Sequence, residues 1–255
     1  MKLKTILHNN LKDQKRKPNR FFETIKDSRN HKELVIIATG PTVTEYSSEQ
    51  VKQFCVGKDV FGIKQAIDLF SDILDVHFFN CSNLPIKNSF YGYKYEKDRP
   101  FVVSSSNFIN SGGRWSSSQI KDLFFKIPAL KNDSKEFLFT TREIEKYLLS
   151  NCLSRPCGPG IFFETVIFFA IHLGYKKIYT LGWDYCGKDN LYGHFYNDGK
   201  KAVNVRIAGD IFEGEIEKVL LFTDFLAEWL ESKQIELKVI GRLSKVTKKF
   251  KRIDL

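Results

Sequence analysis

Several kinds of residue and segment are scarce in this chain. Its five cysteines, at positions 55, 81, 152, 157 and 186, are an odd number without any CxxC spacing. Such a set argues against a disulfide scaffold and a zinc knuckle, and it favours a reducing compartment. No apolar run reaches the roughly 18 residues of a membrane span, and charges interrupt the N-terminal segment throughout. We therefore expect a cytoplasmic protein without a classical signal sequence or a transmembrane helix.

Acidic residues are few relative to basic ones, because 40 Lys and Arg against 30 Asp and Glu give a formal net charge of +10. Residues 1–32 carry ten Lys or Arg against three acids, and the chain from Arg242 onward repeats the bias. Such ends suit nucleic acid or an anionic membrane surface, although a solvated, partly disordered terminus has the same composition. We interpret residues 1–30 as a basic N-terminal arm, a candidate for membrane contact, and residues 246–255 as a basic tail.

The intervening residues 31–245 have the pattern of one α/β domain. Residues 34–38 (LVIIA) are apolar and mostly β-branched without polar alternation, which is typical of a parallel strand covered on both faces. Further strands are predicted at residues 59–63, 76–80, 178–181 and 235–240. Helices are predicted between them, including an amphipathic one over residues 213–232. This order predicts a Rossmann-like doubly wound, mainly parallel sheet with helices on both faces.

A tight turn follows the first strand directly and consists of Thr39, Gly40, Pro41 and Thr42. Where a helix begins soon after such a turn, backbone N–H groups and the helix dipole can receive a phosphate or nucleotide. The turn matches neither GxGxxG nor a P-loop, because GKS or GKT is missing. An ordinary strand-to-helix turn is the alternative.

Polar residues also follow the other predicted strands. Lys64 and Gln65 end the second strand, where Lys64 is either a phosphate clamp or a surface charge. His77 lies inside the third strand and is expected to be a core histidine rather than a ligand. The carboxyl ends of parallel strands share one edge of a sheet, so we expect these positions to face one site.

Residues 157–184 are the most informative stretch of the chain. They contain a glycine-flanked turn (Gly158, Pro159, Gly160), an apolar helix that ends at Gly174, and a strand followed by Gly182 and Asp184. The next residues, 186–212, are polar and aromatic and are expected to form a small lid. Asp184 is a candidate for the site, with a simple turn cap as the alternative.

Three motifs together resemble the bacterial sialyltransferases of the Campylobacter and Haemophilus type and related enzymes that transfer Kdo from CMP-Kdo. They read LVIIATGPT, FGIKQ and HLGYKKIYTLGWDY, and the third is the most specific. The resemblance spans most of residues 34–241. It implies a glycosyltransferase that moves an ulosonic acid from a CMP-sugar to a hydroxyl of a bacterial surface glycan, lipopolysaccharide or capsule. It implies neither a metal nor another cofactor.

Carried over position by position, the resemblance implies a nucleotide site made of turn residues and strand ends. These are Thr39, Gly40, Pro41, Thr42, Lys64, Gln65, Asn80, Ser82, Gly158, Pro159, Gly160, Gly182, Asp184 and Tyr185. Two departures concern Thr39 and Lys64, which stand where the family has Asn, so contacts to the donor sugar or phosphate must differ. Lys64 adds a positive charge that suits an anionic CMP donor.

The catalytic base is a further departure, because the family's histidine before the last helix is replaced here by a Phe-Glu-Gly-Glu segment. An acceptor hydroxyl needs a base with a pKa near the working pH, which His194 in the lid satisfies, as would Glu213 or Glu215 if buried. In a retaining mechanism a carboxylate would instead be the nucleophile, either Asp184 or a glutamate before the last helix. Donors for the leaving phosphate include Lys64 and three tyrosines: Tyr185, Tyr192 and Tyr196.

Two other functional classes fit parts of the sequence. A pterin pyrophosphokinase-like enzyme shares a glycine-proline turn and would prefer ATP with magnesium. A nucleic-acid-binding module would explain the basic ends, but no RNP, KH or helix-turn-helix pattern is present. The partners we expect are therefore a CMP-activated sugar, a glycan or lipid-linked acceptor, and the anionic inner face of the bacterial membrane, without nucleic acid.

Overall fold

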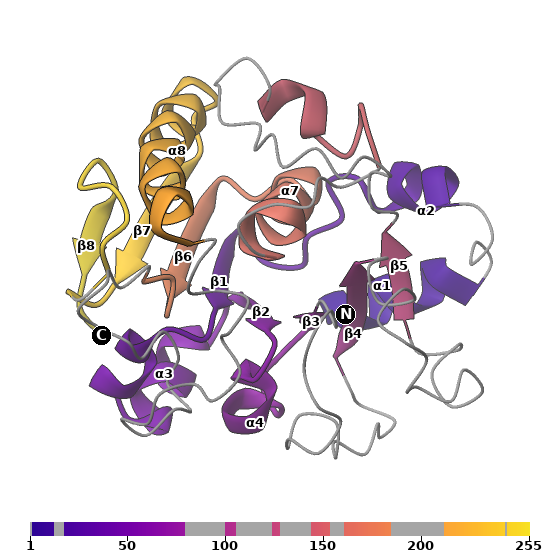
Figure 1. Cartoon of the computed structure of the whole chain (residues 1–255). Helices are drawn as coiled ribbons and strands as arrows, with labels where there is room; N and C mark the ends of the chain where they lie inside the picture. Colours follow the sequence, from indigo (N-terminus) through magenta and orange to yellow (C-terminus); the bar gives the residue numbers. More distant parts are fainter. Residues whose placement is uncertain are drawn as a thin grey trace.

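The computed structural model describes the protein over residues 2–12, 18–79, 100–105, 124–127, 144–153, 161–184, 212–242 and 244–255. These segments form one eight-stranded sheet flanked by helices (Figure 1). The strands are β1 (Glu33–Ile37), β2 (Asp59–Ile63), β3 (Val76–Phe79), β4 (Phe101–Ser105), β5 (Phe124–Ile127), β6 (Lys177–Leu181), β7 (Glu236–Ile240) and β8 (Lys251–Ile253). The α-helices are α1 (Leu3–Lys12), α2 (Pro18–Ile25), α3 (Ser48–Cys55), α4 (Ala66–Phe70), α7 (Ile167–His172) and α8 (Phe212–Ser232).

The strand order is β5-β4-β3-β2-β1-β6-β7-β8, and every neighbouring pair is parallel. The chain runs outward from β1 to one edge, returns to the centre at β6, and then runs to the other edge. Because crossovers between parallel strands are right-handed, this reversal puts α3 and α4 on one face and α8 on the opposite face. The predicted doubly wound, Rossmann-like fold class is confirmed.

The central strand β1 separates two hydrophobic cores. Leu34 and Ile36 belong to the core formed with α1, α2, α7 and α8. Val35 and Ile37 belong to the core formed with α3 and α4. All four side chains are fully buried, which explains why the strand lacks polar alternation.

The first thirty residues contain two helices whose apolar side chains lie in the core. Leu3, Leu7 and Phe21 have no exposed surface. Phe21 stacks on Phe101 of β4 with ring centroids 5.8 Å apart. These apolar side chains are therefore covered by the protein itself, while basic side chains of the described part of the segment, such as Lys26, are exposed to an anionic partner.

The basic C-terminal residues also take part in the sheet, because β8 pairs with β7 along its edge. Val246 and Phe250 are buried, and the Arg252 guanidinium donates hydrogen bonds to the carbonyl oxygens of both residues. The interpretation of residues 246–255 as a tail misses this strand. Within the described residues, no helix is long and apolar enough to cross a membrane.

Candidate nucleotide-binding site

The carboxyl ends of β1 and β6 meet at the point where the winding of the sheet reverses. Ile37 pairs with Leu181 in the last register position of the two strands. Beyond the strands, the Ala38 N–H donates to the Leu181 carbonyl and the Gly40 N–H donates to the Gly182 carbonyl, both at 2.7 Å. Two motifs that are far apart in the sequence therefore form one surface, at the position where open α/β sheets bind their ligands.

Hydrogen bonds between Thr42 and Asp184 join these two turns. The Thr42 N–H donates to Asp184 Oδ2 at 2.8 Å, and the Thr42 hydroxyl donates to Oδ1 at 2.7 Å. Thr42 Oγ1 in turn accepts a hydrogen bond from the Gly182 N–H at 3.0 Å. Both side chains are buried, with 0% of Thr42 and 3% of Asp184 exposed. Asp184 thus has a structural role between the turns, and its part in catalysis stays a prediction.

The protonation of Asp184 reflects two opposing influences. Burial raises the pKa of its carboxyl group, while the hydrogen bonds from Thr42 lower the pKa by stabilising the carboxylate. The nearby charge of Glu45 raises the pKa further. The net direction is upward, because the cost of burying the charge outweighs the two hydrogen bonds.

Gly40 is required by the close approach of the two turns. A Cβ atom at this position would lie 2.2 Å from Asp184 Oδ2 and 2.5 Å from the Gly182 carbonyl oxygen. Gly182 has a φ of +74°, a left-handed conformation that side-chain-bearing residues rarely adopt. Both glycines therefore allow the Thr42–Asp184 contact to form.

The N–H groups of the first turn are used within the protein. Those of Gly40 and Thr42 bond to the β6 end, and the Val43 N–H donates to the Gly40 carbonyl at 3.2 Å. Pro41 has no N–H group and begins a 3-10 helix, Pro41–Glu45, rather than an α-helix. The N–H groups of Gly40 and Thr42 are therefore not available to a phosphate, which disfavours the expectation that the backbone of this turn receives one directly.

Lys64 lies at the end of β2, beside the same turn, in a left-handed conformation with a φ of 48°. Its N–H donates to the Phe78 carbonyl at 2.8 Å, and its own carbonyl oxygen lies 2.8 Å from His77 Nε2. Burial lowers the pKa of His77 to about 4, so the ring is neutral near pH 7 and its Nε2–H donates to Lys64. The prediction of His77 as a core histidine is confirmed. The hydrogen bond from His77 to the Lys64 carbonyl helps to hold Lys64 in its left-handed conformation.

Gln65 follows Lys64 and is 4% exposed. Its Oε1 atom is buried, and no described residue donates a hydrogen bond to it. Buried polar atoms normally have a hydrogen-bond partner, so this oxygen is available to accept a hydrogen bond from a group outside the described residues. Thr39, on the neighbouring strand end, is also buried, at 6% exposure.

Trp183 supports the end of β6 from the side of the larger core. Its ring stacks on Phe162 with centroids 4.2 Å apart, and Phe162 begins a π-helix, Phe162–Val166, that leads into α7. The Ser244 hydroxyl donates to the Trp183 carbonyl at 2.6 Å, and the Lys245 N–H donates to the Asp184 carbonyl at 2.7 Å. Sequence reasoning missed these supporting residues, although Trp183 lies between two residues that it selected.

Several predicted site residues lie outside the described residues: Asn80, Ser82, Gly158, Pro159, Gly160, Tyr185, Tyr192, His194 and Tyr196. Glu213 and Glu215 lie at the start of α8, and only their backbone is described. The helix has 21 residues, a length of about 30 Å, and β7 follows its last turn directly. Its first turn therefore lies toward the carboxyl edge of the sheet, the edge that carries Asp184.

No family model matches the chain, and no curated protein sequence matches it. One similar solved structure is a mammalian sialyltransferase in complex with Gal-beta-1-3GalNAc-ortho-nitrophenol, at 10% identity over 95% of this chain and 86% of that chain, with a TM-score of 0.44. This likeness is too distant to support an argument about function.

The described residues contain no cluster of His, Cys, Asp or Glu side chains that could hold a metal ion.

Proposed function

We propose that the protein is a glycosyltransferase that binds a CMP-activated ulosonic acid, sialic acid or Kdo, where β1 and β6 meet. It transfers this sugar to a hydroxyl of a bacterial surface glycan such as lipopolysaccharide or capsule. One observation carries the proposal. Thr42 and Asp184, 142 residues apart in two of the motifs that resemble CMP-sugar transferases, are joined at the ligand-binding edge of the sheet.

In this proposal, Lys64 supplies the positive charge for the phosphate of CMP. It lies at the end of the strand next to β1, where the backbone N–H groups of the first turn are already used. An ammonium group attracts a phosphate without the geometric demands of a bidentate contact. Gln65 then offers its buried oxygen to a donor of the nucleoside, either the amino group of the base or a ribose hydroxyl.

Asp184 acts in this proposal as a positioning residue rather than as the base or nucleophile. Both of its oxygens accept hydrogen bonds from Thr42, and its side chain is only 3% exposed, which suits a residue that holds the two turns together. The base that takes the proton of the acceptor hydroxyl is therefore sought at the start of α8, at Glu213 or Glu215, or at His194.

The reaction is proposed to take place in the cytoplasm, at the inner face of the bacterial membrane. A lipid-linked acceptor would present its sugar there, and the basic surface of the protein would favour an anionic bilayer. The whole sequence carries a net charge of +10, which is opposite in sign to an anionic bilayer and favours contact with it.

The test of the proposal is donor cleavage. The purified protein is incubated in EDTA with CMP-sialic acid and, separately, with CMP-Kdo, and release of CMP is followed by chromatography. We expect release from one of these donors, increased by bacterial glycan. Preference for ATP with magnesium would support a pyrophosphokinase-like enzyme, and salt-sensitive binding of DNA or RNA without any effect of CMP would support a nucleic-acid-binding module.

A further inference from the structure

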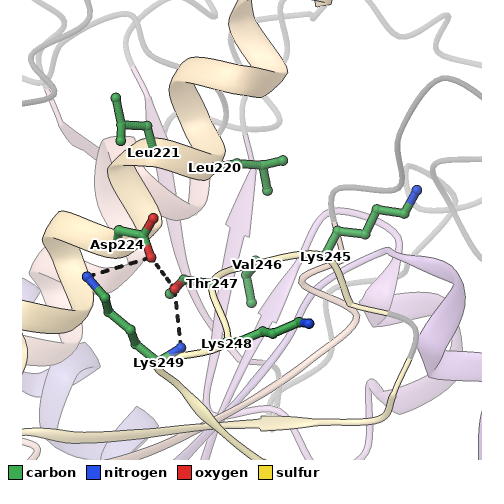
Figure 2. A pocket seen from close by; sticks show the side chains of 8 residues that line it. All are labelled: Leu220, Leu221, Asp224, Lys245, Val246, Thr247, Lys248 and Lys249. Atoms are coloured by element: carbon green, nitrogen blue, oxygen red, sulfur yellow. Dashed lines mark hydrogen bonds and ion pairs between the residues drawn. The ribbon is translucent and has the colours of Figure 1, made fainter.

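A groove of about 600 Å³ lies between α8 and the segment that follows β7 (Figure 2). Leu220 and Leu221 of α8 form one side, and the loop of residues 245–249 forms the other. Leu221 is 53% exposed, which makes it one of few large apolar side chains exposed on the described surface. The groove therefore combines exposed apolar area with a lysine-rich loop.

Hydrogen bonds join the loop to α8 and to the end of β6. At the middle of the loop, the Thr247 N–H donates to Thr223 Oγ1 at 3.0 Å, and the Thr247 hydroxyl donates to Asp224. At its first residue, the Lys245 N–H donates to the carbonyl of Asp184. The groove consequently borders the candidate nucleotide site.

The three lysines of the loop differ in what they contact. The Lys249 ammonium is 2.6 Å from Glu228 Oε1 and 3.9 Å from Asp224 Oδ1. Lys245 and Lys248 are exposed and form no ion pair with any residue that the structure describes. Figure 2 shows both pointing away from Lys249. Residues 244–252 (SKVTKKFKR) contain no acid, and Asp224, the acidic residue among those that line the groove, is paired with Lys249, so Lys245 and Lys248 supply the positive charge of the groove.

We propose that this groove is a docking surface for an anionic lipid bilayer. Lys245 and Lys248 would contact lipid phosphates, and Leu221 would enter the interface between headgroups and acyl chains. Single-stranded nucleic acid fits less well, because stacking on its bases requires exposed aromatic side chains and the lining of the groove contains none.

The N-terminal helices offer no comparable surface, since their apolar side chains are buried in the core. Docking through the groove would hold the carboxyl edge of the sheet, with Asp184, beside the membrane surface. This consequence deepens the proposed function by placing the site near a lipid-linked acceptor. The binding of the bilayer itself does not depend on that function.

The experiment is co-sedimentation of the full chain with vesicles of phosphatidylcholine alone or with an equal part of phosphatidylglycerol. We expect binding only to the anionic vesicles, with an affinity that falls about tenfold in the Lys245→Gln/Lys248→Gln variant and also falls in Leu221→Ser. The matched control, Lys26→Gln/Lys32→Gln, removes the same charge from exposed positions before β1 and is expected to bind like the wild type.

Three results would overturn the docking surface. One is wild-type chain that does not sediment with anionic vesicles, and another is a groove variant that binds normally while the control variant loses binding. The third is binding of inorganic phosphate by the wild-type chain that the groove variant loses, while neither protein binds vesicles. This result would indicate a site for small anions. CMP binding is measured in the same samples, and its absence from every variant would count against the proposed function without deciding the docking surface.

Discussion

Thr42 satisfies three buried polar groups with one backbone N–H and one hydroxyl. Its side chain bonds to Asp184 Oδ1 and to the Gly182 N–H, and neither group has access to water at this depth. The hydrogen bonds therefore matter less for their own strength than for what their loss would leave unpaired. Thr42 thus adds side-chain hydrogen bonds to the backbone bonds that already join the two turns at the candidate site.

Replacing Thr42 by Val is expected to destabilise the protein by about 2 kcal/mol, because a buried carboxylate oxygen and a buried N–H lose their partner. Urea unfolding followed by circular dichroism measures the effect. Thr42→Ser is the matched control, since it keeps the hydroxyl and should lose clearly less stability. A larger loss in Thr42→Ser than in Thr42→Val would show that the methyl group, rather than the hydroxyl, is what the site needs.

Asp75 provides a residue-scale test that is remote from the candidate site. Burial and the charge of Asp59 raise the pKa of Asp75 to about 6, although the Val60 N–H donates to its Oδ2 at 3.0 Å. Between the ordinary pKa of 3.8 and this value, the folded protein holds a proton that the unfolded chain releases. Stability is therefore lost as the pH rises through this window, and the full penalty applies above it.

The Asp75→Asn variant cannot ionise, and its amide oxygen can still accept the bond from Val60. It should be more stable than the wild type by about 2 kcal/mol at pH 8, with a smaller difference at pH 5. Urea unfolding at the two pH values checks this expectation. A difference that does not change with pH would mean that Asp75 keeps an ordinary pKa in the folded protein.

At the scale of elements, the end of β2 combines backbone strain with a proposed ligand contact at Lys64. Lys64→Ala and Lys64→Gly both remove the ammonium group, so both should weaken CMP binding about tenfold. Glycine accepts the left-handed φ of 48° without cost, and Lys64→Gly should be more stable than Lys64→Ala by about 1 kcal/mol. Calorimetric titration with CMP and thermal unfolding separate the two effects. Unchanged CMP affinity in both variants would remove Lys64 from the site.

Elements with a complete local pattern could be predicted from the sequence. β2 has the predicted bounds, β1 is shifted by one residue from its prediction, and α8 begins one residue earlier than predicted. β8 could not be predicted, because its three residues, KRI, are mostly charged and become a strand only through pairing with β7. The π-helix before α7 likewise has no local sequence pattern that distinguishes it from an α-helix.

Some features of the candidate site could likewise be predicted from the sequence, and others could not. The strand ends that carry Lys64, Gly182 and Asp184 follow from apolar runs that stop at polar residues, so their common edge was predictable. The bonds of Thr42 to Asp184 were not, since they depend on which strands become neighbours. The occupied N–H groups of the first turn depend on the same pairing.

At the scale of the whole molecule, the N-terminal segment is part of the domain. Its helices contribute Leu3, Leu7, Phe21, Phe22 and Ile25 to the larger core, each at most 2% exposed. Deletion of residues 1–30 should therefore lower the melting temperature by many degrees or cause aggregation, because it uncovers apolar surface on the sheet. Thermal unfolding measures this, with Lys26→Gln/Lys32→Gln as the control for charge alone. A truncated chain that melts like the wild type would show that the segment contributes no packing energy.

The reversal of winding between β1 and β6 organises the molecule, since it creates the candidate site and sets the face on which α8 lies. The groove beside α8 then borders this site through the loop that bonds to Asp184. Nucleotide binding and membrane docking are in this way proposed for adjacent surfaces at one edge of the sheet.

The central claim is that this edge binds the cytidine nucleotide without a metal. Isothermal titration of the wild-type chain with CMP in EDTA tests it most directly, with AMP and UMP titrated in parallel. We predict saturable binding of CMP that is tighter than that of AMP or UMP and that weakens in Lys64→Ala. Absence of CMP binding, or equal binding of the three nucleotides that Lys64→Ala leaves unchanged, would contradict the claim.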